Sequence, residues 1–162
     1  MKKNIRIVLI GEILLLVTQF LFNLILSEGD PRITILWFID IPSLLLILLI
    51  LIPGLLIMGE WKDFIKSFSV GIKPYGLLEL KNIIEAVGAA QKLTVYGALL
   101  AIITSGIFLM GRPDDPSTIG PNLAVCFLPG FYAVIVEFLL LPLKLNAERK
   151  MNEEMDLEDG EN

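Results

Sequence analysis

Apolar residues along this chain come in long blocks, and short polar segments separate the blocks. Four blocks are long enough to cross a bilayer as helices, because a hydrocarbon core of ~30 Å takes about 20 helical residues. None of them alternates apolar and polar residues, as the strands of a membrane barrel do. The pattern therefore predicts four spans, at residues 7–27, 41–58, 93–111 and 123–143.

The longest polar connection, residues 60–92, predicts an amphipathic helix. Leu77, Leu80, Ile84 and Val87 recur at helical spacing, so they share one face of that helix. Such a helix is expected to lie on the membrane or to pack against neighbouring subunits. A connection of this length is too short to form a separate catalytic domain.

The predicted fold class is all-α: a polytopic membrane protein with four transmembrane helices and a short amphipathic connection. Composition agrees, because 55% of the residues are hydrophobic and the mean hydropathy is +0.75. Residues 1–145 are expected to form the membrane domain, with Asp40 capping the second span. Residues 146–162 form an acidic tail, which is expected to be solvated and disordered.

Basic residues predict the orientation of the chain in the membrane. Of the thirteen lysines and arginines, all but Arg32 and Arg112 lie before the first span, within residues 60–92, or after the fourth span. Positively charged loops stay on the cytoplasmic side. Both termini and the long connection are therefore expected to be cytoplasmic, and the connection between the last two spans is expected to face outward.

Composition argues against an enzyme. The chain has no histidine, which is the commonest general base and metal ligand, and its one cysteine, Cys126, lies inside the fourth span. It has no nucleotide-binding, nucleophile or metal-binding motif. We therefore expect no catalytic residue, no cofactor, no metal site and no nucleic-acid partner, and we take Cys126 as a small packing residue.

A few polar residues inside the spans are candidates for function. Glu137 is the one carboxylate placed deep in the membrane, where a charge costs about 2.5–3.5 kcal/mol on insertion scales. It should face the bundle interior or water, and a structural hydrogen bond remains as open as an ion pathway. Thr104 and Ser105 could line a pore, although such hydroxyls usually bond to their own helix. Glu12 is expected to form an interfacial ion pair with Arg6.

Three sequence patches resemble the MotA/TolQ/ExbB family, which includes the MotA subunit of the flagellar stator. The patch "DDPSTIGPNLAV…FYA…LLLPLK" (114–144) resembles the corner and fourth span of MotA. The patch "WFIDIPSLLLIL" (37–48) resembles the start of its second span, and "KDFIKSF" (62–68) resembles the helix that follows. The order and orientation of the spans also match over most of residues 35–150.

The resemblance implies a structure and a function. Asp114, Asp115 and Pro116 would form a rigid outer corner between two pore-lining helices. Pro116 and Pro142 match two prolines that couple ion flow to movement in the family. In that family, five such subunits form a ring around a pair of single-span partners, and the same arrangement would give this chain partners that resemble MotB or ExbD. The complex would lie among the lipids of the bacterial inner membrane. The chain is thus expected to be a ring subunit of a proton- or sodium-driven channel or motor complex.

The chain also departs from the family pattern. It lacks the large cytoplasmic insertion that pushes the flagellar rotor. Its hydroxyl-rich sites are also partly lost: the family's threonine positions are taken by Leu51 in the second span, by Ile102 in the third, and by Pro129 and Gly130 in the fourth. Thr104, Tyr132 and Glu137 remain as polar candidates for an ion pathway. These differences leave a second interpretation open, a non-conducting membrane scaffold or assembly protein of the same ancestry.

Overall fold

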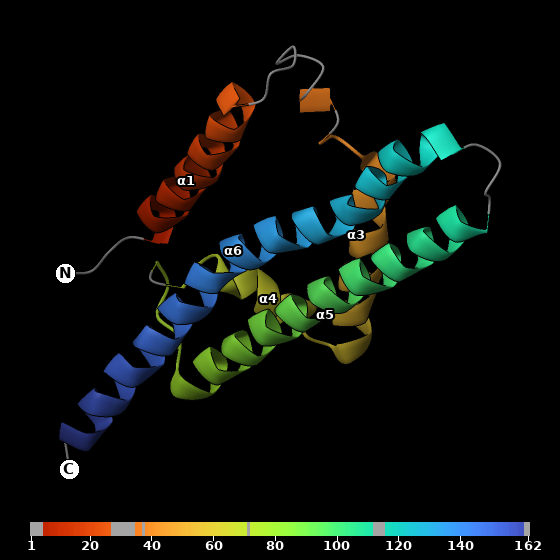
Figure 1. The fold of residues 1–162 in the computed structure, drawn as a ribbon. Helices are drawn as coiled ribbons and strands as arrows, with labels where there is room; N and C mark the ends of the chain where they lie inside the picture. The colour runs from red at the N-terminus through yellow and green to blue at the C-terminus, as the bar shows by residue number, and fades with distance from the viewer. Residues whose placement is uncertain (1–4, 27–34, 37, 71, 112–115, 161–162) are drawn as a thin grey trace.

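A computed structural model describes residues 5–26, 35–36, 38–70, 72–111 and 116–160 of the chain. The described part is built almost entirely from helices (Figure 1). The helices are α1 (Ile5–Leu26), α3 (Ile41–Met58), α4 (Trp61–Ser67), α5 (Leu77–Met110) and α6 (Pro116–Gly160).

Four of these helices, α1, α3, α5 and α6, are long and apolar enough to cross a membrane. This confirms the predicted all-α polytopic class. Each of their apolar windows is at most 28% buried inside the chain, and that of α1 is not buried at all. Most of the apolar surface is therefore available to lipid or to other protein chains.

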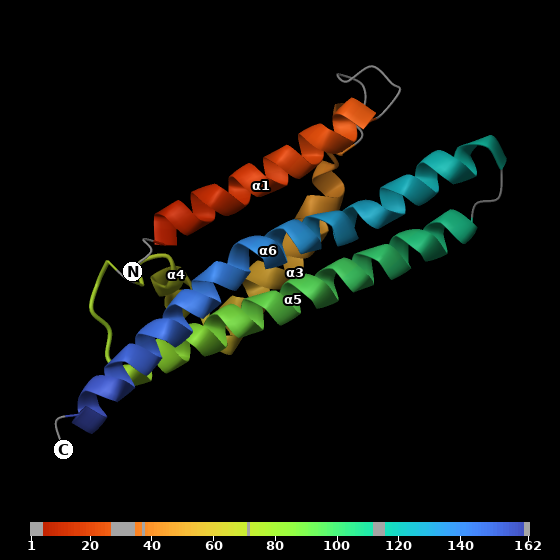
Figure 2. The ribbon, with the colours of Figure 1, turned by 60° about the vertical axis from the view of Figure 1, so that its left-hand side comes forward.

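The last two helices form the centre of the molecule. α5 and α6 run side by side along most of their length (Figures 1 and 2). α3 and α4 pack mainly against α5, and α1 contacts α6. Every other described helix is thus held through the α5–α6 pair.

Both central helices are longer than the sequence patterns predicted. α5 joins the amphipathic segment and the third span into one helix of 34 residues, about 51 Å at 1.5 Å per residue. α6 continues past the fourth span to Gly160 and is 45 residues long in all, about 68 Å. Because a hydrocarbon core is ~30 Å thick, both helices extend beyond it. We call residues 77–92 of α5 and 144–160 of α6 the paired extension.

The paired extension corrects two expectations. Residues 146–160 are helical, so the expected disorder of the acidic tail is wrong for them. The amphipathic face of α5 packs within the chain instead of on a membrane or a neighbour. Its Leu80 and Ile83 are buried against Ala147 of α6 and against Val70. This packing explains why an acidic segment stays helical, because most helix stability in proteins comes from tertiary contacts.

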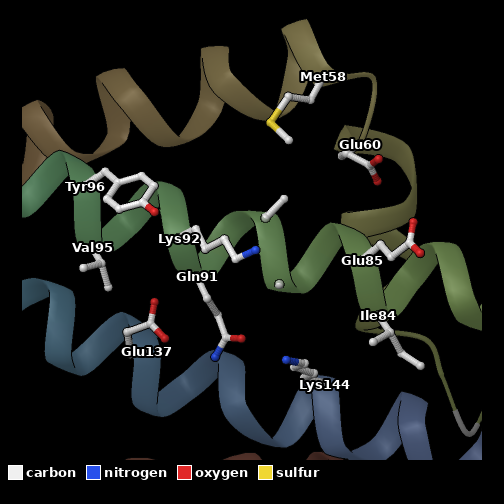
Figure 3. Close-up of a pocket in the computed structure, with 12 residues that line it drawn as sticks. Met58, Glu60, Ile84, Glu85, Gln91, Lys92, Val95, Tyr96, Glu137 and Lys144 are labelled. Carbon is white, nitrogen blue, oxygen red and sulfur yellow. The ribbon is translucent and has the colours of Figure 1, made fainter.

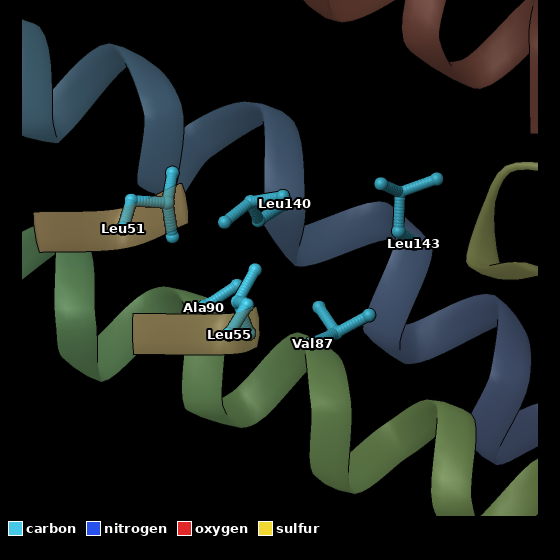
Figure 4. Packing of buried hydrophobic residues seen from close by; sticks show 6 residues of the cluster. All are labelled: Leu51, Leu55, Val87, Ala90, Leu140 and Leu143. Carbon is cyan, nitrogen blue, oxygen red and sulfur yellow. The ribbon is translucent and has the colours of Figure 1, made fainter. Parts of the chain in front are cut away.

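A second cluster holds three helices together where the apolar spans meet the paired extension. Figure 4 shows side chains of α3, α5 and α6 converging there. The cluster's buried members are Leu51, Leu55, Val87, Ala90, Leu140 and Leu143. α3 approaches α5 closely at Gly54, where an added Cβ would lie 2.8 Å from Leu93 Cδ1 and would force that side chain to move.

The start of α3 confirms the predicted cap. The Asp40 side chain accepts a hydrogen bond of 3.1 Å from the Ser43 backbone N–H. Pro42 lies in the first turn, where a backbone N–H has no acceptor within the helix, so its missing N–H costs no hydrogen bond. A polar side chain thus satisfies one of the open donors that every helix start carries.

Candidate functional site along the α5–α6 seam

One face of α5 and one face of α6 line a row of hollows between the two helices. The lining residues are spaced three or four apart, so on each helix they form a single stripe. We call this pair of stripes the α5–α6 seam. It consists of Gln91, Val95, Ala98, Ile102, Ser105 and Leu109 on α5, and of Asn122, Cys126, Gly130, Ala133, Glu137 and Leu141 on α6.

The hollows differ in polarity along the seam. At the end near Met110 and Pro116, which we call the corner end, a hollow of about 510 Å³ is lined by Ser105 and Asn122 among apolar groups. The middle hollow, about 500 Å³, is lined almost entirely by apolar side chains. The largest hollow, about 750 Å³, lies at the opposite end, which we call the charged end. Its ionisable lining groups are Glu60, Glu85, Lys92, Tyr96, Glu137 and Lys144.

Glu137 lies where the middle and largest hollows meet, because it lines both. Figure 3 shows its carboxylate between α6 and α5, in the space into which the Gln91 side chain extends from α5. The Gln91 amide and the Lys144 ammonium are the polar groups that lie within electrostatic reach of this carboxylate. Its Oε1 atom is enclosed and has no hydrogen-bond partner among the described residues. An enclosed carboxylate oxygen needs a proton, an ion or a donor to offset its lost hydration.

The two hydroxyl candidates of α5 behave differently. Thr104 Oγ1 donates a hydrogen bond of 2.6 Å to the backbone oxygen of Leu100, and its side chain is exposed away from the hollows. Ser105 lines the hollow at the corner end. The fold therefore brings Ser105 and Glu137 to the same seam and leaves Thr104 outside it.

Tyr132 connects α6 to the start of α3. Its hydroxyl donates a hydrogen bond of 2.6 Å to the Phe38 backbone oxygen and accepts one of 2.7 Å from the Asp40 backbone N–H. The two bonds link segments more than ninety residues apart in the chain. The hydroxyl thus fixes the position of the α3 cap.

The predicted outer corner is described only in part. Asp114 and Asp115 lie outside the described residues, and Pro116 is the first residue of α6. Pro142 is buried inside α6, which continues for eighteen more residues to Gly160. Pro142 therefore lies near the end of the predicted fourth span, residues 123–143, but well inside the helix that contains it.

Two residues of the site were not predicted from the sequence. Gln91 and Lys92 fall at the boundary drawn between the amphipathic segment and the third span. The 3.6-residue period continues across that boundary, and it would have placed Gln91 on the same face as Val95 and Ala98. Periodicity, used without the hydropathy boundary, would therefore have identified Gln91 as a residue of the seam.

Glu12 has an environment similar to that of Glu137. Its Oε2 atom is enclosed and has no hydrogen-bond partner within the described part of the chain. The predicted partner, Arg6, has a side chain outside the described positions. Glu12 belongs to α1, which contacts α6, so both carboxylates lie on helices that touch each other.

No group of three metal-ligating side chains occurs in the described ranges. No family model, curated protein or solved structure matches this chain. The resemblance to the MotA/TolQ/ExbB family thus stays a prediction from the sequence patches.

Proposed function

We propose that this chain is a ring subunit of a proton- or sodium-driven channel or motor complex, and that ions move along the α5–α6 seam. The observation that carries the proposal is Glu137. It is a carboxylate within an apolar stretch, with an enclosed and unbonded oxygen at the junction of two hollows. Ionisable residues at such depth are costly and commonly mark ion or proton paths.

Polar groups stand at both ends of the seam but not between them. From Ser105 to Gln91 the α5 stripe contains only Val95, Ala98 and Ile102, over about 21 Å of helix. The facing part of α6 is apolar apart from the Cys126 thiol. An ion cannot cross that distance in hydrocarbon without a polar group to replace its water. The proposal therefore requires a polar side chain from a partner.

A partner of the expected kind fits this gap. The sequence resemblance implies a single-span protein that carries an aspartate in its helix, and several copies of this chain around it. The low burial of the four apolar windows leaves surface for both contacts. In this arrangement the chain sits in a bacterial inner membrane with both termini and the paired extension in the cytoplasm.

Ion flux in liposomes tests the proposal. The chain is reconstituted with any single-span protein that a neighbouring gene encodes, and proton or sodium uptake is followed under a membrane potential. We expect Glu137→Gln to reduce flux by at least tenfold, because the seam loses its titrating group. Asp156→Asn, an exposed carboxylate of the tail, is the matched control and should leave flux unchanged. Equal flux in wild type and Glu137→Gln would refute the role of the seam.

A second candidate function is a non-conducting scaffold. Thr104 bonds to its own helix, and the Tyr132 hydroxyl both donates and accepts within the chain. Neither group is then free to replace the hydration of an ion. A wild-type complex that assembles with its partner and carries no ion current would support this alternative.

A further inference from the structure

From its charged end to its middle hollow, the seam changes from charged to polar to apolar, as a phospholipid does from its headgroup to its acyl chains. Its largest hollow is lined by lysines and glutamates, its junction by Gln91 and Glu137, and its middle hollow by apolar side chains. A phospholipid presents a charged headgroup, then ester carbonyls, then an acyl chain, in that order. We infer that this part of the seam binds one phospholipid whose headgroup carries a primary ammonium, as ethanolamine does.

The lysines of the largest hollow provide the phosphate contact. Lys92 comes from α5 and Lys144 from α6, and both line the largest hollow; Figure 3 shows Lys144 between the two helices and Lys92 lying along α5. Both stand where the apolar spans give way to the paired extension, which is the level of lipid headgroups. Basic pockets between membrane helices at this level bind lipid phosphates.

The glutamates select the rest of the headgroup. Glu60 and Glu85 lie toward the α3–α4 turn, away from Glu137 (Figure 3). Glu85 also lies 4.0 Å from Lys81, and both side chains are exposed, so this pair leaves the carboxylate accessible. Besides Glu137 at the junction, the hollow is lined by two lysines and two glutamates, which match a headgroup with one negative and one positive charge. A primary ammonium can donate hydrogen bonds to both carboxylates, whereas a quaternary ammonium cannot.

The junction and the middle hollow fit the remainder of the lipid. The Gln91 amide can donate to an ester carbonyl, and so can the Tyr96 hydroxyl, which lines the same hollow. Beyond them the middle hollow of about 500 Å³ is lined by side chains such as Leu99, Val134 and Phe138. An acyl chain in this hollow covers apolar surface that the chain itself leaves open.

This inference goes beyond the proposed conduction and does not depend on it. A bound lipid fills the space that ions would use, so lipid occupancy and ion flux should oppose each other if both occur. The lipid is tested on the purified chain without a partner protein. The two proposals can therefore fail separately.

Native mass spectrometry of the detergent-purified chain, with lipids added at equal concentration, measures the binding. We expect the chain to retain phosphatidylethanolamine about tenfold better than phosphatidylcholine or phosphatidylglycerol. The double variant Lys92→Gln, Lys144→Gln should lower this retention about fivefold. Lys62→Gln, an exposed lysine that does not line the hollows, is the control and should retain the lipid as wild type does.

A second pair of variants tests the acyl-chain site without removing any charge. Val134→Trp fills the middle hollow from an exposed position, and Ile107→Trp places the same side chain at an equally exposed position outside it; their exposures are 66% and 65%. Only Val134→Trp should abolish lipid retention, while circular dichroism shows both variants equally helical. Retention that is equal for the three lipids, or unchanged in Val134→Trp, would overturn the inference. Loss of ion flux in Glu137→Gln with retention intact would leave it standing.

Discussion

At the residue scale, the polar side chains of this protein divide into those with partners inside the chain and those without. Tyr132 and Asp40 have their hydrogen bonds made locally, at the start of α3. Glu137 and Glu12 each keep one enclosed oxygen without a partner among the described residues. A satisfied group stabilises the fold, whereas an enclosed unsatisfied one costs stability and indicates another use.

The bonds of Tyr132 give a stability prediction. Tyr132→Phe removes one donor and one acceptor and leaves the ring in place. Each lost hydrogen bond costs about 0.5–1.5 kcal/mol, so we expect the free energy of unfolding to fall by about 1–3 kcal/mol. Tyr96→Phe, an exposed tyrosine on α5, should change it little. Unfolding titrations in mixed micelles measure both variants, and equal stabilities would show that the link to α3 is not formed.

The Asp63–Lys66 pair on α4 gives a pH prediction. Lys66 Nζ lies 2.8 Å from Asp63 Oδ1, and this hydrogen bond raises the pKa of Lys66 above its ordinary value of 10.5. The pair's stabilisation is therefore present at neutral pH and is lost as the pH rises through the raised pKa. Asp63→Asn should lower the pKa of Lys66, as NMR titration of the side chain would show. The change in stability should be small, because the lysine is partly exposed.

At the scale of elements, hydropathy predicts the membrane spans better than it predicts where the helices begin and end. Hydropathy located the four spans, because a bilayer demands a minimum apolar length. It placed false boundaries in α5 and α6, where an apolar block changes to a polar one inside a continuous helix. Nothing in composition shows that residues 146–160 will be held against α5. That depends on the tertiary contact of Ala147 with Leu80 and Ile83.

The same division holds for the candidate site. Glu137 could be found from the sequence because a lone carboxylate in an apolar block is conspicuous. Ser105 could be named but not distinguished from Thr104, since adjacent helical residues point about 100° apart and only the packing selects one. Gln91 and Lys92 were missed because they fall at the predicted boundary between the connection and the third span, and α5 runs through that boundary without a break.

The paired extension gives a prediction about hydrogen exchange. Ala147 of α6 is fully buried against Leu80 and Ile83 of α5. Ala147→Asp therefore places a charge in an apolar contact. We expect faster amide exchange over residues 144–160 and 77–84 by mass spectrometry. Arg149→Asp introduces the same side chain at an exposed position and should leave exchange nearly unchanged. Rapid exchange of these residues in the wild type would contradict the extension itself.

At the scale of the whole molecule, the α5–α6 pair both organises the fold and forms the candidate site. The side of α6 that carries Leu140 and Leu143 packs into the cluster with α3 and α5. The stripe that carries Glu137 lines the hollows. One helix thus separates a packed face from a face with open space. The two faces are joined through Ala98 and Ala133, which line the seam and are also buried in a small cluster with Ile47.

Thiol labelling along α6 tests the seam most directly. In a Cys126→Ser background, which removes the one native cysteine, Glu137→Cys and Leu140→Cys are treated with a small charged thiol reagent in detergent from which phospholipid has been removed. The seam predicts rapid labelling at position 137, through the hollow at the charged end. It predicts protection at position 140, whose side chain is buried in the cluster. Protection at 137 equal to that at 140 would contradict the account.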